Sequence, residues 1–571
     1  MTDRRIADLV QAMNQGQITR RQFIQRAVAL GVSLPALALA LTPEAGAAPG
    51  SSPQVPSSRG QSDVTTLVIA DNLAGNWITL DPARIYEINS QAAMNVVYEC
   101  LYHLPDSTKA DQFEPLLAEA MPEVSADGKE VTIKLRPGVT FHNTGNEMTS
   151  ADWIYSWDRL KAVADNPSFL ADYLGTYEAL DPLTLKLTLD SPNAALVPIL
   201  AATPLSVSDS AAVKEQGGAD LASAGTPEAQ STIDFMTQQS AGTGPYRVTV
   251  WDIETEVVVE AHPEYWGGSP KLQRIIWRNV PDPNTQLQLV QTGEVDIAYA
   301  VDPDRVADVE IDPNLQIISG PTLNIDYLGL NVSEAVGGPL AKKELRQAIA
   351  YAIDYDGIIN GLSGGASVRP GTVIPLPLLG TEEIQPLQYK TDLAKAQALF
   401  ATLGGPVDLT LTYGAGASSA NGVSLDVLLA KIQDDLQKID GLTIKLNPMD
   451  QAQRLADFRA GKIAFTFSGW SPDYPDVHTY AEPFATTGGA AAKRVAYSNP
   501  QADDLLARGI AELDPEKRKQ IYVDLQKIMI DDAAFIVLEQ PVDRKPATKA
   551  VQGVSTHSVY MIQLRNASKT A

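Results

Sequence analysis

Cysteine is nearly missing from this sequence: Cys100 is the only one among 571 residues. A chain with one cysteine forms no internal disulfide. Histidine is also scarce, since only five are present and none has the spacing of a zinc motif such as HExxH. These shortages argue against a disulfide-stabilised scaffold and against a structural zinc site. We therefore expect no metal and no cofactor.

Positive charge is in short supply as well. Lys and Arg total 44 against 69 Asp and Glu, which gives a net charge of −25. A protein of this sign repels phosphate backbones and anionic lipids, so we expect no nucleic-acid partner. The length exceeds what one hydrophobic core supports and predicts two or three domains.

The uncharged run near the N-terminus is too short for an ordinary transmembrane helix. It spans residues 27–41, follows the basic stretch TRRQFI at 19–24, and precedes the small residues 45–47. This order of segments is typical of a secretory signal peptide with its cleavage site. We therefore expect residues 1–47 to be a signal peptide, followed by a flexible Pro/Ser/Gly-rich leader at 48–63.

Arg20, Arg21 and Phe23 resemble the motif positions of the twin-arginine export signal. Two chance arginines before a general secretory signal are the alternative interpretation. No cysteine lies near the cleavage region, so no lipid anchor is expected there. The sequence thus predicts a soluble periplasmic protein that is exported by the twin-arginine (Tat) machinery.

Apolar periodicity predicts that strands and helices alternate along the chain, which is typical of α/β domains with mixed sheets. Strands are expected at 64–70 and 183–189, and a hairpin around 126–128. Helices are expected at 90–102, 150–157 and 341–353, from Thr391 as N-cap to 403, and from Asp514-Pro515 onward.

No catalytic residue is expected. His142 lies beside a turn, with no cysteine, serine elbow or paired carboxylate near it in the sequence, so a structural role is favoured. The pair Gly242 and Gly244 lacks the remaining glycines of a phosphate loop. A hydrolase with catalytic residues that are distant in sequence stays open as an alternative.

The segment Phe465–Asp476, FTFSGWSPDYPD, has the pattern of a buried strand that ends in a turn. Trp470 offers a broad apolar wall, and the Asp473 carboxylate can accept charge-assisted hydrogen bonds from a ligand amine. The alternative interpretation is an ordinary strand exit with a solvated carboxylate.

Several short motifs along the mature chain keep the order and spacing of one protein family. They are LDP at 80–82, VYECL at 97–101, the block at 127–152, GTGPYRV at 242–248, YWGG at 265–268, GEVDIA at 293–298, LRQAIAYAID at 345–354 and YSNPQADDLL at 497–506. The chain resembles the bacterial extracellular solute-binding proteins of family 5, the oligopeptide-, dipeptide- and nickel-binding components of ABC importers.

The resemblance implies a type II periplasmic-binding-protein fold with two α/β lobes, a hinge, and an extra domain inserted in the first lobe. Lobe I would comprise residues 64–103, 191–302 and 538–571. The inserted domain would be 104–190, and lobe II 303–537. A ligand would be held between the lobes as they close.

The resemblance also implies ligand-binding residues. In peptide-binding members, the position of Asp473 pairs with the α-amino group of the ligand and the position of Trp470 lines the slot. Tyr474, next to Asp473, is a further candidate. Some oligopeptide binders have an arginine three residues before the tryptophan, where this chain has Phe467. Arg369 is an alternative partner for a ligand anion, or a solvated loop residue.

Asn89 and Ser90 lie where the first lobe approaches the ligand in this family, and helix capping is their alternative role. The resemblance implies a monomeric receptor without catalytic activity that delivers a solute to an ABC transporter permease. A short peptide is the leading ligand. An opine or other amine, a glycoside, a metal chelate and glutathione are the alternatives.

Overall fold

The structure is a computed structural model that describes residues 63–74, 76–218 and 229–570. The predicted signal peptide at 1–47 and residues 48–62 of the leader predicted at 48–63 lie outside these residues. None of the helices in the described ranges is long and apolar enough to cross a membrane.

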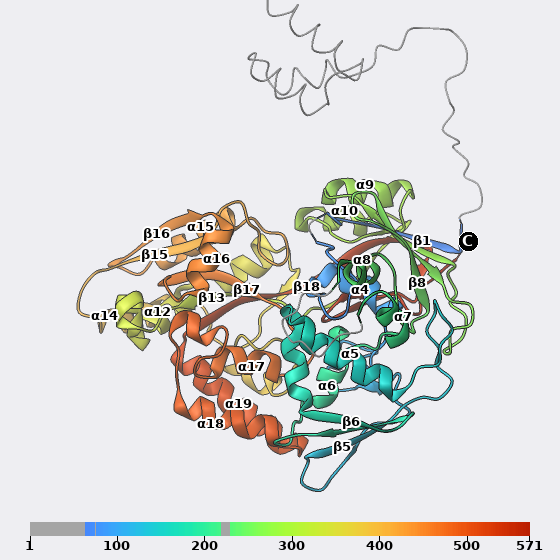
Figure 1. Cartoon of the computed structure of the whole chain (residues 1–571). Coiled ribbons are helices and arrows are strands. Elements are labelled where there is room, and N and C mark those ends of the chain that lie inside the picture. Colours follow the sequence, from blue (N-terminus) through green and yellow to red (C-terminus); the bar gives the residue numbers. More distant parts are fainter. Residues whose placement is uncertain (1–62, 75, 219–228, 571) are drawn as a thin grey trace, which may run out of the picture. The chain divides into compact units, whose positions relative to one another are not determined.

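Strands and helices alternate as predicted, and the α/β class is confirmed (Figure 1). The largest sheet has twelve strands. They are β1 (Thr66–Asp71), β8 (Tyr246–Asp252), β9 (Glu256–Ala261), β10 (Arg274–Asn279), β11 (Ile297–Ala298), β12 (Leu315–Pro321), β13 (Ile325–Leu330), β14 (Ser367–Val368), β15 (Val407–Gly414), β16 (Leu442–Met449), β17 (Phe465–Trp470) and β18 (Phe535–Thr548).

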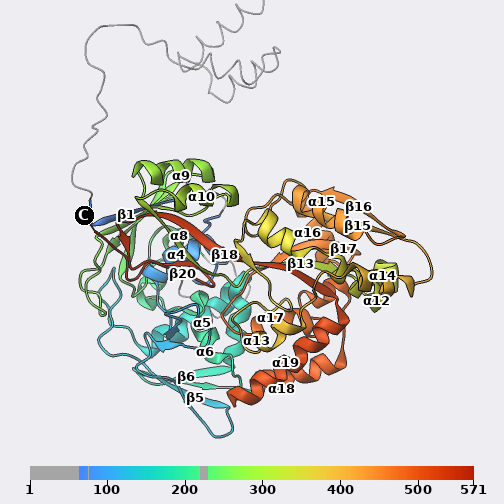
Figure 2. The ribbon, with the colours of Figure 1, turned by 180° about the vertical axis from the view of Figure 1, so that it is seen from behind.

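The long strand β18 joins two groups of strands in this sheet. Its first half pairs antiparallel with β13, which neighbours β17, and its second half pairs with β12 and β11, next to β1. In Figures 1 and 2 this strand, drawn in red, runs from the neighbourhood of β13 to that of β1. One continuous segment therefore connects the parts of the sheet that carry the two largest hydrophobic cores.

Both faces of β1 are buried. Leu67 and Ile69 belong to a core with α4 (Ile88–Val97), whereas Ala70 on the opposite face packs with residues of α9 (Pro283–Thr292). A parallel strand covered on both faces reads as a nearly continuous apolar run, which explains the sequence TLVIAD. Within the sheet, β1 pairs in parallel with β10 on one side and with β11 on the other.

The second core lies around β13, β15 and β17. Leu328 packs on one face with α12 (Lys343–Ala352) and α15 (Leu425–Leu436), while Tyr327 faces the opposite side. Helix α14 (Leu393–Ala401) also packs in the core that contains Leu328. The helices on the side of Tyr327 are α17 (His478–Ala485), α18 (Pro500–Ala511) and α19 (Pro515–Asp532).

A separate four-stranded antiparallel sheet carries the predicted hairpin, which is confirmed. Its strands and packed helices are β4 (Glu123–Val124), β5 (Glu130–Lys134), β6 (Thr176–Asp181), β7 (Thr184–Thr188), α5 (Ser150–Val163) and α6 (Leu196–Leu200). As predicted, α5 begins after Thr149, whose side chain forms a capping box with Asp152.

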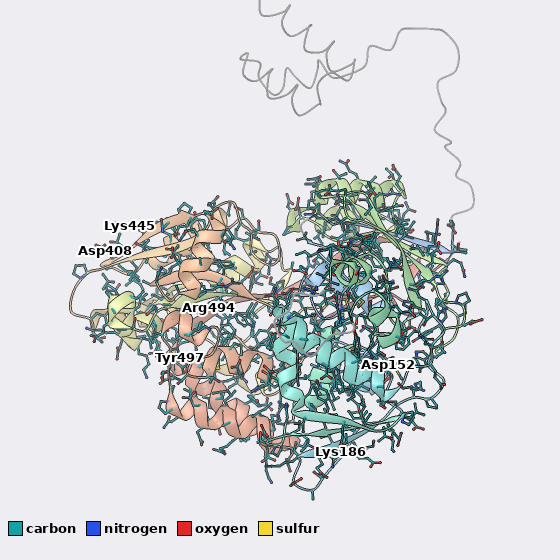
Figure 3. All side chains as sticks on the ribbon, in the orientation of Figure 1. Asp152, Lys186, Asp408, Lys445, Arg494 and Tyr497 are labelled. Carbon is teal, nitrogen blue, oxygen red and sulfur yellow. The ribbon has the colours of Figure 1, made fainter. Side chains whose placement is uncertain are left out.

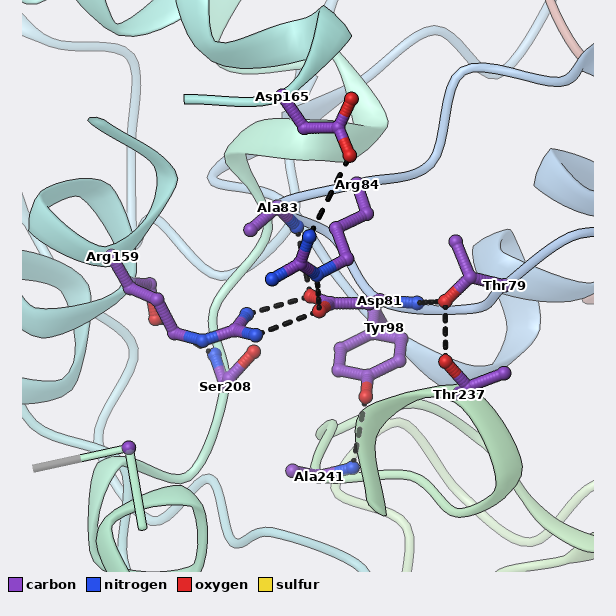
Figure 4. A network of polar contacts seen from close by, with 12 residues as sticks. Thr79, Asp81, Ala83, Arg84, Tyr98, Arg159, Asp165, Ser208, Thr237 and Ala241 are labelled. Carbon is purple, nitrogen blue, oxygen red and sulfur yellow. Dashed lines mark hydrogen bonds and ion pairs between the residues drawn. The ribbon is translucent and has the colours of Figure 1, made fainter. Parts of the chain in front are cut away.

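A buried ion pair ties the LDP motif to α5 (Figure 4). The two terminal nitrogens of the Arg159 guanidinium, Nη1 and Nη2, donate to the Asp81 carboxylate, at 2.6 and 2.7 Å. Arg84 approaches the same carboxylate at 3.4 Å. Burial alone raises the pKa of Asp81, but the charge and hydrogen bonds of Arg159 outweigh it and hold the pKa below its usual value.

Two predicted boundaries are wrong. The helix predicted at 90–102 ends at Val97, because Tyr98 is extended and Tyr102–His103 forms β2, paired with β3 (Glu114–Pro115). Asp392 rather than Thr391 caps α14, since the Asp392 carboxylate accepts from the Lys395 amide. The remaining elements are α7 (Ser210–Glu215), α8 (Gln230–Gln238), α10 (Val306–Glu310), α11 (Glu334–Gly337), α13 (Thr381–Ile384), α16 (Gln451–Arg459), β19 (Val551–Gln552), β20 (Ser555–His557), β21 (Met561–Gln563) and β22 (Ser568–Lys569).

The glycines of GTGPY allow close backbone packing. A Cβ on Gly244 would lie 2.5 Å from the Val96 carbonyl oxygen, at the end of α4. Because that neighbour is backbone, we expect Gly244→Ala to lower the free energy of unfolding by about 1–3 kcal/mol, the usual cost of overpacking. Urea denaturation measures the change, with Gly405→Ala as control, since a Cβ there meets open space. Equal stability of the two variants would contradict this explanation.

Candidate functional site

The segment singled out in the sequence forms β17 and the turn that follows it. Strand β17 lies between β13 and β15, antiparallel to the first and parallel to the second. Phe465 and Phe467 belong to the core with α12 and α15, whereas Trp470 packs on the opposite side, with its ring 5.1 Å from that of Phe484. The strand therefore delivers Trp470, and then Asp473, to the side away from Phe467.

Asp473 is half-buried and receives one side-chain hydrogen bond. The Tyr86 hydroxyl, from the segment before α4, donates to the Asp473 Oδ1 atom at 2.9 Å. Burial raises the pKa of Asp473 to about 6, the bond from Tyr86 opposes this shift, and the nearby Glu482 adds to it. No ion pair to Asp473 is formed within the described ranges. The carboxylate is thus desolvated without a cation to neutralise it.

A cleft opens beside Asp473. One side is formed by Tyr86, Ile88 and Gln91, and the other by the end of β17 and the turn to Asp473. The indole nitrogen of Trp470 is buried and has no hydrogen-bond partner in the described structure. A ligand in this cleft meets an apolar wall, an unpaired donor and a carboxylate.

Two arginines that the sequence did not point to line the same cleft. Arg459 ends α16, and Arg494 lies in the short helix Ala492–Val495 (Figure 3). The Arg494 guanidinium lies 5.3 Å from the centre of the Trp470 ring. No motif marked these arginines, because they lie 11 residues before and 24 residues after Trp470 in the printed sequence.

A second cavity lies on the other side of Asp473. Tyr474 and Pro475 line it together with aromatic and aliphatic side chains from the first core and the C-terminal strands. At its edge, the buried Glu99 carboxylate accepts from Tyr265, Trp266 and Thr243, and pairs with Arg565 at 2.5 Å. Glu99 of the VYECL motif and Tyr265 and Trp266 of the YWGG motif therefore belong to one buried polar network at the edge of this cavity.

Tyr474, Asn89 and Ser90 lie near the cleft without lining it. Tyr474 is buried with its ring 6.3 Å from that of Tyr173. Asn89 donates to the buried Asp71 carboxylate at 3.2 Å, and the Ser90 hydroxyl donates to the Glu87 carbonyl at the start of α4. In this conformation these contacts hold α4 in place, but neither Asn89 nor Ser90 caps it, since Glu87 is the N-cap residue and no side chain forms a capping hydrogen bond.

Phe467 and Arg369 are not brought to Asp473. Phe467 packs in the core on the opposite face of β17. Arg369 stacks on Tyr355, 3.6 Å from the ring centre, donates to Gln388, and also donates to the Tyr389 carbonyl. It lines a different pocket, together with the end of α19 and the start of β18. Its guanidinium is thus occupied by partners within its own core.

The histidines have structural surroundings. The His142 Nε2 atom lies 2.8 Å from the Ser240 hydroxyl, and burial lowers the pKa of His142 to about 3. Among the described residues, no group of three or more His, Cys, Asp or Glu side chains is arranged to hold a metal ion.

Comparison with known proteins decides the family. A sequence profile of the bacterial extracellular solute-binding proteins, family 5, matches residues 112–492. The chain belongs to this family. Its members are receptors for transport, so membership implies that the chain binds a solute and works with the permease of an ABC importer.

Individual relatives agree with the family. The chain is 31% identical over 482 residues to the glutathione-binding protein GsiB of Pectobacterium atrosepticum, covering 82% of this chain and 87% of that protein. HbpA2 from Haemophilus parasuis matches with a TM-score of 0.76 at 25% identity, over 89% of this chain and 100% of that one. AgaA from A. tumefaciens R10, in complex with agropinic acid, matches with a TM-score of 0.68 at 26% identity, over 89% and 99%. The predicted type II periplasmic-binding-protein fold is confirmed.

Proposed function

We propose that this chain captures a short peptide in the cleft beside Trp470 and delivers it to the permease of an ABC importer. The observation that carries the proposal is the unneutralised carboxylate of Asp473, which lines the cleft and receives a side-chain hydrogen bond from Tyr86 alone. An α-ammonium group of a peptide supplies the missing positive charge and satisfies the remaining acceptor positions. Trp470 packs against the peptide beside its amino end.

The cleft lies between the two lobes in this proposal. Lobe I comprises residues 64–103, 191–302 and 538–571, the inserted domain 104–190, and lobe II 303–537. Separate hydrophobic cores for β1 with α4, for the four-stranded sheet, and for β13 with β17 support this division. Tyr86 and Asp473 then stand on opposite lobes, so their hydrogen bond stabilises a closed form.

The exported state of the protein is part of the same proposal. Residues 1–47 direct the chain to the Tat machinery through Arg20, Arg21 and Phe23, and are then removed. The mature receptor is a periplasmic monomer that carries no lipid anchor and catalyses no reaction. Peptide hydrolysis by the purified protein, lost on substitution of one residue, would contradict this last point and favour a hydrolase.

A non-peptide amine is the second candidate ligand. The structural likeness to AgaA, which holds agropinic acid, favours an opine within the same fold. The likeness to GsiB points instead to glutathione, a tripeptide with a free α-amino group. Short peptides and glutathione both carry an α-ammonium group that can use the same anchor at Asp473, so the proposal for the carboxylate does not depend on the choice between them.

Calorimetric titration tests the proposed function. Purified mature protein is titrated with Ala-Ala, Ala-Glu, trialanine, pentaalanine, glutathione and agropinic acid. We expect saturable binding of at least one peptide and no binding of its N-acetylated form. Binding of agropinic acid alone would move the ligand class to opines, and binding of none would contradict the proposed ligand classes.

Tyr86→Phe tests the role of the hydroxyl group. The hydrogen bond from Tyr86 lowers the pKa of Asp473, so its removal raises that pKa further above 6. We expect the pH below which peptide binding weakens to move upward in this variant, with a loss of affinity at pH 7.5 of at least about tenfold, as for one hydrogen bond to a charged group. Titrations between pH 5 and pH 8 measure both effects. An unchanged pH profile would contradict the contact.

A further inference from the structure

Two residues that line the cleft each have a buried side-chain nitrogen without a hydrogen-bond partner. The Nε atom of Arg494 and the indole nitrogen of Trp470 are both buried without a partner in the described structure. Both belong to residues that line the cleft.

The two arginines of the cleft also have no counter-ion. No carboxylate within the described ranges forms an ion pair with Arg459 or Arg494. Burial lowers the pKa of Arg494, and the neighbouring charge of Arg459 lowers it further, which places the two guanidinium groups within electrostatic reach of each other. Two like charges at one wall of a cleft favour an anion between them.

The carboxylate of Asp473 and the guanidinium groups of Arg459 and Arg494 belong to one small site. The charges of Asp473, Arg459 and Arg494 all act on the Tyr86 hydroxyl, and all four residues line the same cleft. A ligand that reaches from Asp473 to the arginines is therefore short. The arginine that some family members have at position 467 is replaced here by Phe467, which faces the core. The chain supplies positive charge from other segments instead.

We propose that Arg459 and Arg494 form a carboxylate site, so that the ligand is a short zwitterion with its α-ammonium group on Asp473 and a carboxylate on the two arginines. This inference rests on the proposed function and narrows its ligand class. Because two positive groups face one negative group, a peptide with one more carboxylate than ammonium matches the cleft better than a neutral one. Ala-Glu and glutathione have that charge, whereas Ala-Ala does not.

Crossed titrations test the two ends of the ligand separately. The peptide of the panel that binds most tightly is compared with its C-terminal amide and with its N-acetylated form, on wild type, Arg494→Gln, Arg459→Gln and Asp473→Asn. Arg508→Gln is the matched control, since Arg508 is exposed on α18 and pairs with Asp504 at 3.3 Å. Thermal unfolding shows whether each variant is folded. If Arg494→Gln does not fold, Arg459→Gln replaces it in the test, because Arg459 is exposed.

Each variant is expected to change the recognition of one end of the peptide only. Wild type and Arg508→Gln should bind the free acid at least about tenfold more tightly than the amide, and Arg494→Gln should lose most of that preference. Asp473→Asn should keep the preference for the acid while losing discrimination against the N-acetylated form. Arg459→Gln should show a smaller loss than Arg494→Gln, because its side chain is exposed.

Three results would overturn the carboxylate site. Equal binding of acid and amide by wild type would contradict it while leaving the receptor function intact. A preference for the acid that persists in the double variant Arg459→Gln/Arg494→Gln would place the carboxylate elsewhere. If no form of any peptide binds even to wild type, the proposed peptide receptor fails and the carboxylate site fails with it.

Discussion

Asp473→Asn is expected to weaken peptide binding by at least about 30-fold without destabilising the protein. Truncating one partner of a buried, hydrogen-bonded charge pair costs about 2–5 kcal/mol of binding free energy, which is the source of this factor. The unfolding temperature of the unliganded protein should stay the same or rise, because burial without a cation raises the pKa of Asp473 to about 6. A neutral amide of the same size relieves that desolvation.

Calorimetry and thermal unfolding at pH 7.5 measure the two quantities on one preparation. Asp408→Asn is the matched control, since Asp408 is exposed on β15 and does not line the cleft. Loss of binding together with a large fall in unfolding temperature would mean that Asp473 supports the fold rather than the ligand.

The same carboxylate predicts how binding depends on pH. An ammonium group binds the ionised form, so affinity should be constant above pH 6 and fall up to tenfold per pH unit below it. The stability of the unliganded protein should move in the opposite direction. Since the folded-state pKa is raised, the contribution of Asp473 to stability is present below its usual pKa and is lost as pH rises through 6. Both trends should disappear in Asp473→Asn.

Arg159→Gln is expected to cause the largest loss of stability, about 3–5 kcal/mol. Removing one partner of a buried ion pair costs about that amount, and Asp81 would then keep the longer ion pair with Arg84, at 3.4 Å. Arg159 is the bidentate partner of Asp81, whose side chain is fully buried (Figure 4). Because this pair joins the segment before α4 to α5, its loss should also loosen the four-stranded sheet from the first core.

Urea denaturation measures this effect. Lys186→Gln is the control, because the ion pair of Lys186 with Glu130 on the same four-stranded sheet is exposed, and exposed pairs contribute little. We expect no measurable change for Lys186→Gln. Equal midpoints for Arg159→Gln and wild type would contradict a structural role for the buried pair.

The sequence was informative where the signal is local. The strand that ends at Trp470 and the turn that carries Asp473 follow from twelve consecutive residues, and the structure has both. The alternation of side chains along the same strand also predicts which way Phe467 faces. Side chains alternate faces every residue in a strand, so Phe467 must face away from Trp470, three positions on. The period alone thus separates Phe467 from the cleft that Trp470 lines.

Contacts between distant segments could not be predicted in this way. Tyr86 reaches Asp473 across 387 residues, and Arg459 and Arg494 arrive from a helix end and a short helical turn that carry no motif. Arg369 had a plausible sequence position for an anion partner, but only packing decides that it stacks on Tyr355. Chain topology, rather than local pattern, places these side chains.

Native mass spectrometry of the wild-type protein, purified without refolding, tests the central claim most directly. We predict a retained small molecule that carries a primary amine, released on collision and absent from Asp473→Asn prepared in parallel. A ligand without an amine, or the same ligand at equal occupancy in Asp473→Asn, would contradict the assignment of Asp473 as the amine anchor.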